Sequence, residues 1–358
     1  MSTVIKEFNQ EKAESFMGQM VQVLNGGALS MMISIGHRTN LFDTMSALEP
    51  STSAEIASAA NLNERYVREW LAAMTTGRVI EYDPQDSTYF LPPEHASILT
   101  RSGDANFGVT MQFISVMGEV ESKIVDRFQN GGGVDYECYC RFHSVMAEES
   151  SQTVVAALQD HILPLEPGLV EKLETGIDVL DVGCGSGRAI CELAKRFPKS
   201  RFVGFDLCQE TIESANATVA KMELANVQFE QKDVATLTEG QSFDLVFAFD
   251  AIHDQAAPAK VLDEIHRVLK DDGLFLMQDI AGSSQLENNY DHPIATFMYT
   301  ISCMHCMSVS LAQGGAGLGA MWGKELACEM LNAARFNNVR VEQLEHDIIN
   351  YYYIAKKD

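Results

Sequence analysis

A run of glycines after a short apolar segment is the part of the sequence best suited to binding a ligand. Residues 178–182 are rich in apolar side chains and predict a buried strand with Asp181 near its end. Gly183, Gly185 and Gly187 follow directly. Glycines at this spacing allow a sharp turn and let the backbone lie against a ligand, because a Cβ would stand in the way. The pattern therefore indicates a ligand-binding turn between a strand and a helix.

Three further aspartates follow apolar segments of the same kind. Asp206, Asp233 and Asp250 each come at the end of a predicted strand. Because the carboxyl ends of parallel strands meet at one edge of a sheet, we expect these side chains and Asp181 to surround one ligand. A carboxylate offers two oxygens at the spacing of a diol, so Asp206 is suited to hold both hydroxyls of a ribose.

The run from Asp181 to Gly187 resembles the Asp-x-Gly-x-Gly-x-Gly motif of class I S-adenosylmethionine-dependent methyltransferases. Nicotinamide and flavin enzymes use related glycine runs. The acid at 181 and the early third glycine favour the methyltransferase motif, because no pyrophosphate has to be held. The resemblance implies S-adenosyl-L-methionine as cofactor, with Asp233 accepting a hydrogen bond from the adenine amino group. The cofactor-binding residues that it implies are Asp181, Gly183, Gly185, Gly187, Asp206, Leu207, Asp233, Val234, Phe249 and Asp250.

His253 is the first candidate for a catalytic base. Methyl transfer from a sulfonium is an in-line displacement, in which the enzyme chiefly positions donor and acceptor and excludes water. A hydroxyl or ammonium acceptor must also lose a proton, which a histidine can take near neutral pH. Segment 249–255 resembles the His-Asp-Trp segment of plant-type small-molecule O-methyltransferases, whose histidine is the general base, although Gln255 stands where that family has Trp. A histidine that only packs the loop is the other reading.

A second group of residues suited to substrate binding lies in segment 299–323. Methionine, cysteine and aromatic side chains around His305 predict a mostly apolar cavity, and His305 is a second candidate for handling the proton. Cys303 and Cys306 flank His305, but a structural zinc site needs a second pair at the usual spacing, so no metal is expected. The predicted substrate-binding residues are Tyr136, Tyr139, Tyr299, Met304 and Trp322.

The first hundred residues predict a winged helix. Two short helices, at 55–60 and 64–76, precede two segments that flank a Pro-Gln-Asp turn and form a β-hairpin. Residues 51–100 hold three Arg, no Lys and seven Asp or Glu, a charge balance that disfavours binding to phosphate. We therefore expect no nucleic-acid partner. In methyltransferases that resemble this chain the winged helix is a dimerisation platform, so a homodimer is expected.

The 358 residues carry a net charge of -24 and scattered cysteines, which suit a soluble cytoplasmic protein better than a disulfide framework. The N-terminus lacks the layout of a signal peptide, and no membrane span is expected. Strands alternating with helices from residue 177 predict an α/β domain with a parallel sheet. Two closing strands match the seven-stranded, Rossmann-like sheet of class I methyltransferases. The expected domains are 1–100 (winged helix), 101–167 (helical linker and substrate cover) and 168–358 (cofactor binding).

The whole chain resembles the winged-helix branch of class I methyltransferases, including a bacterial and invertebrate group of unassigned substrate. The resemblance rests on the Gly-Gly-Gly-Val-x-Tyr, Asp-Ala-Ile-His-Asp-Gln and Gly-Leu-Gly-x-Met-Trp-Gly stretches. It implies an enzyme that methylates a small, partly apolar metabolite, and an oxygen or nitrogen acceptor is favoured. Methylation of a thiol or thioether, which needs no base, is one alternative. A transcriptional regulator that senses the cofactor is the other.

Overall fold

The computed structural model describes residues 8–103, 105–238 and 240–357. The chain divides into two compact units, Met1–Ser115 and Val116–Asp358, which are described separately.

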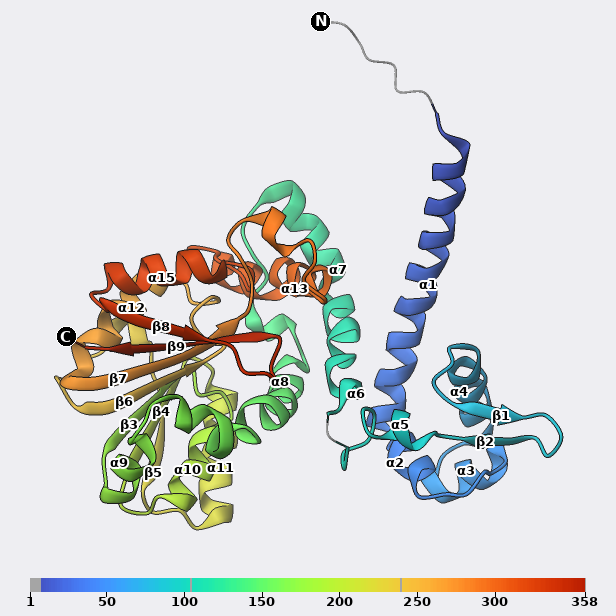
Figure 1. Cartoon of the computed structure of the whole chain (residues 1–358), viewed down its shortest axis with the longest axis horizontal. Helices are drawn as coiled ribbons and strands as arrows, with labels where there is room; N and C mark the ends of the chain where they lie inside the picture. Colours follow the sequence, from blue (N-terminus) through green and yellow to red (C-terminus); the bar gives the residue numbers. More distant parts are fainter. Residues whose placement is uncertain (1–7, 104, 239, 358) are drawn as a thin grey trace, which may run out of the picture. The chain divides into compact units, whose positions relative to one another are not determined.

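A seven-stranded sheet forms the centre of the second unit (Figure 1). Its order is β5-β4-β3-β6-β7-β9-β8, in which β9 runs antiparallel to both of its neighbours and the other pairings are parallel. The predicted α/β class and the two closing strands are confirmed. The strands are β3 (Asp178–Val182), β4 (Arg201–Asp206), β5 (Val227–Gln231), β6 (Phe243–Phe249), β7 (Leu269–Ile280), β8 (Asn338–Glu342) and β9 (Asn350–Lys356).

Alternating apolar residues along the strands bury both faces of this sheet. Val179 and Leu245 pack with one hydrophobic cluster, whereas Leu180 and Val246 pack with the other, because successive side chains point to opposite faces. Helices α9 (Leu169–Thr175), α10 (Arg188–Arg196) and α11 (Gln209–Met222) contribute to the first cluster. Helices α12 (Pro258–Val268) and α15 (Gly323–Ala333) contribute to the second. This burial fixes the register of the strands.

Two helical segments of the second unit lie outside the alternating pattern of strands and helices. The first contains α7 (Gln112–Asn130), which belongs to this unit from Val116 onward, α8 (Phe142–Ser150) and the π-helical turns Ser151–Val155 and Leu158–Ile162. The second contains α13 (Ala295–Ile301), the π-helical turn Ser302–Cys306 and α14 (Met307–Ala312).

The two helical segments are in close contact at Gly133. A Cβ on Gly133 would lie 1.8 Å from the Ser308 carbonyl oxygen, and the Val134 N–H donates to Ser308 Oγ at 2.9 Å. The last glycine of the Gly-Gly-Gly turn thus allows a close approach to α14.

The first unit contains the predicted winged helix. Helix α3 (Ser53–Ala60) begins with a capping box between Thr52 and Glu55, and α4 (Glu64–Thr76) buries Trp70. Strands β1 (Glu81–Asp83) and β2 (Thr88–Phe90) form the hairpin. The other helices of the unit are α1 (Gln10–Arg38), α2 (Leu41–Ser46), α5 (Pro93–Ala96) and α6 (Phe107–Thr110).

Helix α1 runs without interruption through Gly26 and Gly27. A glycine inside a helix costs about 1 kcal/mol relative to alanine, which is too little to end a helix of 29 residues. Further along, Gly36 lets α1 pack against Trp70 and Phe42, since a Cβ there would lie 2.6 and 2.7 Å from their rings.

Across the described residues, no helix combines the length and apolar character that crossing a membrane requires.

Candidate active site

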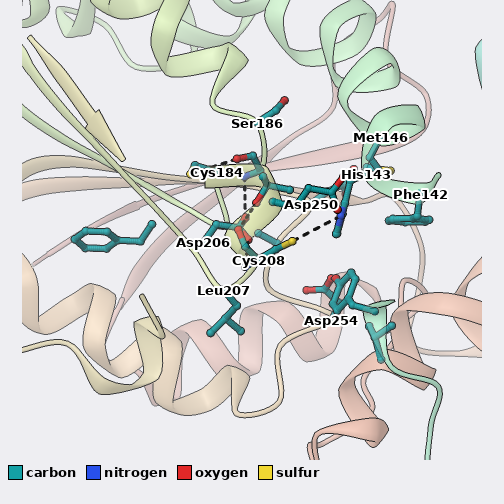
Figure 2. Close-up of a pocket in the computed structure, with 18 of the residues that line it drawn as sticks. Phe142, His143, Met146, Cys184, Ser186, Asp206, Leu207, Cys208, Asp250 and Asp254 are labelled. Atoms are coloured by element: carbon teal, nitrogen blue, oxygen red, sulfur yellow. Dashed lines mark hydrogen bonds between the residues drawn. The ribbon is translucent and has the colours of Figure 1, made fainter. Parts of the chain in front are cut away.

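A cavity of about 820 Å³ opens where the parallel strands of the second unit end (Figure 2). Strand ends and the turns after them supply one part of its wall, and α8, α14 and the segment before α8 supply another. The predicted site residues that line this cavity are Asp181, Gly183, Gly185, Asp206, Leu207, Val234, Phe249, Asp250 and Tyr136.

The glycine turn has the backbone that its sequence predicts. Gly183, Gly185 and Gly187 have φ values of 68°, 51° and 69°, in the left-handed region that favours glycine. A Cβ on Gly185 would meet no described atom within 4 Å, so this residue leaves room beside the turn. A Cβ on Gly187 would lie 2.2 Å from the Phe229 ring, and Gly187 does not line the cavity. The missing side chain thus allows the turn to pack closely against Phe229 of β5.

Asp206 ties the glycine turn to the end of β4. Its Oδ2 accepts from the Gly185 N–H and its Oδ1 from the Cys208 N–H, each at 2.8 Å. Each carboxylate oxygen has a second lone pair, so Asp206 can still accept from a ligand. Asp233 lies elsewhere: it is exposed, its Oδ1 accepts from the Ala235 N–H at 2.8 Å, and it does not line the cavity.

Two carboxylate oxygens in the cavity wall have no hydrogen-bond partner among the described residues. They are Asp181 Oδ1 and Asp250 Oδ1, and both are shut off from solvent. Burial and the neighbouring Asp206 raise the pKa of Asp181 well above its usual value. Burial and the Asp279 carboxylate raise the pKa of Asp250 to about 7. Unpaired buried carboxylates favour a cationic ligand, so these residues fit the ammonium and sulfonium groups of S-adenosylmethionine.

His253 forms a buried pair with Asp279 at the end of β7. Its Nδ1 lies 2.8 Å from Asp279 Oδ1, and the exposed fractions of the two residues are 4% and 0%. Burial lowers the pKa of His253, but the Asp279 carboxylate and the Cys306 thiol outweigh this effect and hold it well above 6.5. The same Asp279 oxygen accepts from Trp322 Nε1 at 3.0 Å. Trp322 therefore braces the pair, and neither Trp322 nor His253 lines the cavity.

His305 lies in a cluster of aromatic rings. It stacks on Phe142 with centroids 3.4 Å apart and meets Tyr136 and Tyr139 edge-on. Burial, followed by the nearby His253, lowers the pKa of His305 well below 6.5, so its ring is neutral. Neither ring nitrogen has a hydrogen-bond partner among the described residues. Because Tyr136 and Phe142 line the cavity and His305 does not, His305 lies behind the wall.

The other predicted substrate residues divide into two places. The Tyr139 hydroxyl donates to the Met304 carbonyl oxygen at 2.5 Å, so both residues belong to the His305 cluster without lining the cavity. Tyr299 does not line it either, and its hydroxyl oxygen accepts from Asn289 Nδ2 at 2.9 Å.

Asp254 and Asp279 are functional candidates that sequence reasoning missed. Asp254 lines the cavity, burial raises its pKa, and the Tyr136 hydroxyl donates to it. Asp254 directly follows His253 in the sequence, and this position could have indicated that it lies at the site. Asp279 is the acid that supports His253, and its position at the end of a parallel strand could have indicated it by the logic applied to Asp181 and Asp206.

Comparisons with known proteins agree with the two parts of the fold. Residues 27–101 match the family model of the Rv2258c-like winged HTH domain, and residues 173–343 match that of a methyltransferase domain. The (S)-coclaurine N-methyltransferase of Papaver somniferum is 28% identical over 129 residues, which are 36% of this chain and 36% of that relative. The trans-aconitate 2-methyltransferase of Azoarcus sp. (strain BH72) is 30% identical over 121 residues, 34% of this chain and 43% of that relative. The chain thus spans less than half the length of these two relatives.

Solved structures resemble the chain over nearly its full length. Human N-acetylserotonin methyltransferase in complex with SAM has a TM-score of 0.69 at 14% identity, covering 100% of this chain and 99% of that one. An O-methyltransferase family protein from Burkholderia thailandensis has a TM-score of 0.66 at 14% identity, covering 96% and 98%. These likenesses show the fold. Together with the family matches, they establish that the chain joins an N-terminal winged-helix domain to a class I S-adenosylmethionine-dependent methyltransferase domain.

Proposed function

We propose that the protein transfers a methyl group from S-adenosylmethionine to a small, partly apolar metabolite. The observation that carries this proposal is a pair of buried oxygens beside the glycine turn, one each from Asp181 and Asp250, that have no hydrogen-bond partner among the described residues. Asp206 would hold the ribose, and Val234 would lie against the adenine. Asp181 and Asp250 would hold the cationic methionine part. When bound, the cofactor supplies an electrophilic methyl group.

We propose that His253 takes the proton of an oxygen or nitrogen acceptor at Nε2, because Nδ1 faces Asp279. Asp279 would orient the ring and stabilise its charged form. The Cys306 thiol is one of the groups that raise the pKa of His253, so it lies near the ring that an acceptor must reach. His305, which is neutral and enclosed by aromatic rings, would serve the apolar part of the substrate site. That His305 handles the proton of the acceptor in place of His253 stays a prediction.

The substrate would enter beside Tyr136, Phe142 and Met146, which line the cavity opposite the strand ends. These aromatic and thioether side chains suit a partly apolar molecule. Tyr139, Tyr299, Met304 and Trp322 would act behind this wall. Residues 101–167 would cover the substrate site. In the sequence they follow a winged-helix domain at 1–100 and precede a cofactor-binding domain at 168–358.

The His253→Ala variant distinguishes oxygen or nitrogen methylation from sulfur methylation. A hydroxyl or ammonium acceptor needs the base, so turnover should fall by about 100-fold or more. A thioether acceptor needs none, and turnover retained within about tenfold would favour sulfur. The acceptor is identified by a labelled-methyl screen of a metabolite extract, with the product assigned by mass.

We propose that a second copy of the chain covers α1. This helix exposes an apolar row, and such patches on a protein surface mark interaction sites. The exposed apolar residues are Phe16, Met17, Met20, Val21, Val23, Leu24, Met31 and Ile35.

The charges of the winged helix support a role in assembly over DNA binding. Arg65 pairs with Glu69 at 2.6 Å and Arg68 with Glu64 at 2.5 Å, so the cations of α4 are neutralised on the helix itself. We also propose a cytoplasmic location, because all eight cysteines are free thiols.

A further inference from the structure

Three metal-binding side chains converge on the rim of the cavity. His143 belongs to α8, Cys208 is the N-cap residue of α11, and Glu210 lies in the first turn of α11. Cys208 Sγ lies 3.8 Å from His143 Nδ1, the contact dashed in Figure 2. One ligand atom from each of the three residues lies within 4.8 Å of the others, and all three residues line the cavity.

We propose that His143, Cys208 and Glu210 bind a zinc-like transition-metal ion. Tetrahedral zinc with ordinary Zn–S and Zn–N bond lengths separates the sulfur and nitrogen by about 3.5 Å, close to the 3.8 Å observed. Glu210 is exposed, so its side chain can move into the first coordination sphere. A set of one nitrogen, one sulfur and one oxygen suits zinc or cobalt(II) and disfavours magnesium and calcium.

The site has the character of an accessible metal site. Three protein ligands leave the fourth tetrahedral position to water or another ligand. His143 and Cys208 are half-buried, so the ion reaches them from the cavity. Binding releases one proton, because the Cys208 thiol must become a thiolate to form the metal–sulfur bond.

This site differs from the one that the cysteine spacing suggested. The pairs at 138/140 and 303/306 form no cluster of three metal-binding groups within the part of the chain that the structure describes. The expectation of no metal rested on those pairs alone. It did not consider His143 and Cys208, which are far apart in the sequence.

Metal and nucleoside should exclude each other, an inference that rests on the proposed function. Asp206, the proposed ribose ligand, accepts from the Cys208 N–H at 2.8 Å. An ion held by Cys208 and His143, together with its remaining ligands, would itself occupy the cavity rim beside Asp206, where the sugar is proposed to lie. Zinc would thus inhibit the enzyme by blocking its cofactor.

The metal part is tested by titrating the purified full-length chain with cobalt(II) and zinc. We expect one ion per chain and a thiolate-to-cobalt charge-transfer absorption that Cys208→Ser abolishes. His143→Ala and Glu210→Gln should each weaken zinc binding by at least about tenfold. Cys140→Ser, which removes an exposed thiol outside the cluster, is the matched control and should bind normally. An unchanged charge-transfer band in Cys208→Ser would overturn the site. So would zinc affinity that none of the three variants lowers.

The competition is tested by calorimetry with S-adenosylhomocysteine as the nucleoside. Saturating zinc should weaken nucleoside binding by at least about tenfold in the native chain and in Cys140→Ser. It should have no effect in Cys208→Ser. Tight binding of zinc and S-adenosylhomocysteine to the same chain at the same time would overturn the proposal that they compete. Zinc binding by a metal-free protein that takes no nucleoside would instead contradict the proposed function and leave the metal site standing.

Discussion

His253 Nδ1 lies 2.8 Å from Asp279 Oδ1, and both side chains are shut off from solvent. A histidine paired in this way is held in one orientation and its charged form is stabilised. The position of Asp279 also explains why Trp322 is buried here, since its indole N–H donates to the same oxygen. The pair is the arrangement on which base catalysis in this chain would depend.

Asp279→Asn should lower turnover by about 100-fold and shift its pH dependence. A base works when unprotonated, so activity should rise with pH through the pKa of His253. The Asp279 carboxylate raises that pKa above 6.5, which places the rise on the alkaline side. Removing the negative charge should move the rise to lower pH. The pH profile of kcat/KM measures it, with Trp322→Phe as the control that keeps the carboxylate. An unshifted profile would contradict the role of Asp279.

Gly185→Ala and Gly187→Ala should fail in different ways. Both residues have positive φ, so both variants should lose about 1–2 kcal/mol from backbone strain. The new Cβ of Gly187→Ala also meets the Phe229 ring at 2.2 Å, so its unfolding free energy should fall further. The Cβ of Gly185→Ala has space but stands in the cavity wall, and this variant should lose nucleoside affinity. Urea unfolding and calorimetry separate the two. Equal losses of stability would contradict the distinction.

Asp250→Asn should stabilise the ligand-free protein at neutral and alkaline pH while weakening nucleoside binding. The pKa of Asp250 is about 7 in the folded protein, against an ordinary value of 3.8. A carboxyl whose folded pKa is raised favours folding while protonated, and this stability is lost as the pH rises from about 4 through 7. Thermal unfolding across this range should therefore show a decline that Asp250→Asn reduces. Asparagine also tolerates the φ of 52° at this position. If stability declined equally with pH in the native chain and in Asp250→Asn, the raised pKa of Asp250 would be contradicted.

Leu24→Glu should break the proposed dimer through α1. Leu24 is 73% exposed in the single chain, and a charge buried in an apolar interface costs several kcal/mol. The dimer dissociation constant should rise by at least about 100-fold, as measured by sedimentation equilibrium. Gln19→Glu is the matched control, because it adds the same charge to the same helix at an exposed polar position. A native chain that is monomeric at micromolar concentration would contradict the assembly.

Regular alternation let the sequence predict the sheet and the acids at its strand ends. Strand β3 lies at the predicted residues 178–182, and strands alternate with helices after it as the sequence predicted. Asp181, Asp206 and Asp250 meet at one cavity because parallel strands end at one edge. Burial of both sheet faces leaves little freedom in register, which is why this part is readable from sequence.

The turns after the strands were harder to predict because their paths depend on packing. Strand β7 continues to Ile280, and its last residues place Asp279 against His253. Asp233 turns outward to cap its own helical turn. The aromatic cluster around His305 contains residues from two segments that are far apart in the sequence, and no periodicity in either segment predicts their contact.

Calorimetric titration with S-adenosylhomocysteine tests whether the cavity at the strand ends binds the nucleoside cofactor. We expect one site per chain, with micromolar or tighter affinity that falls by at least about tenfold in Asp206→Asn. Glu230→Gln, on the neighbouring strand but outside the cavity wall, should bind like the native chain. No heat with this nucleoside, together with saturable binding of a nicotinamide or flavin nucleotide, would contradict S-adenosylmethionine as the cofactor.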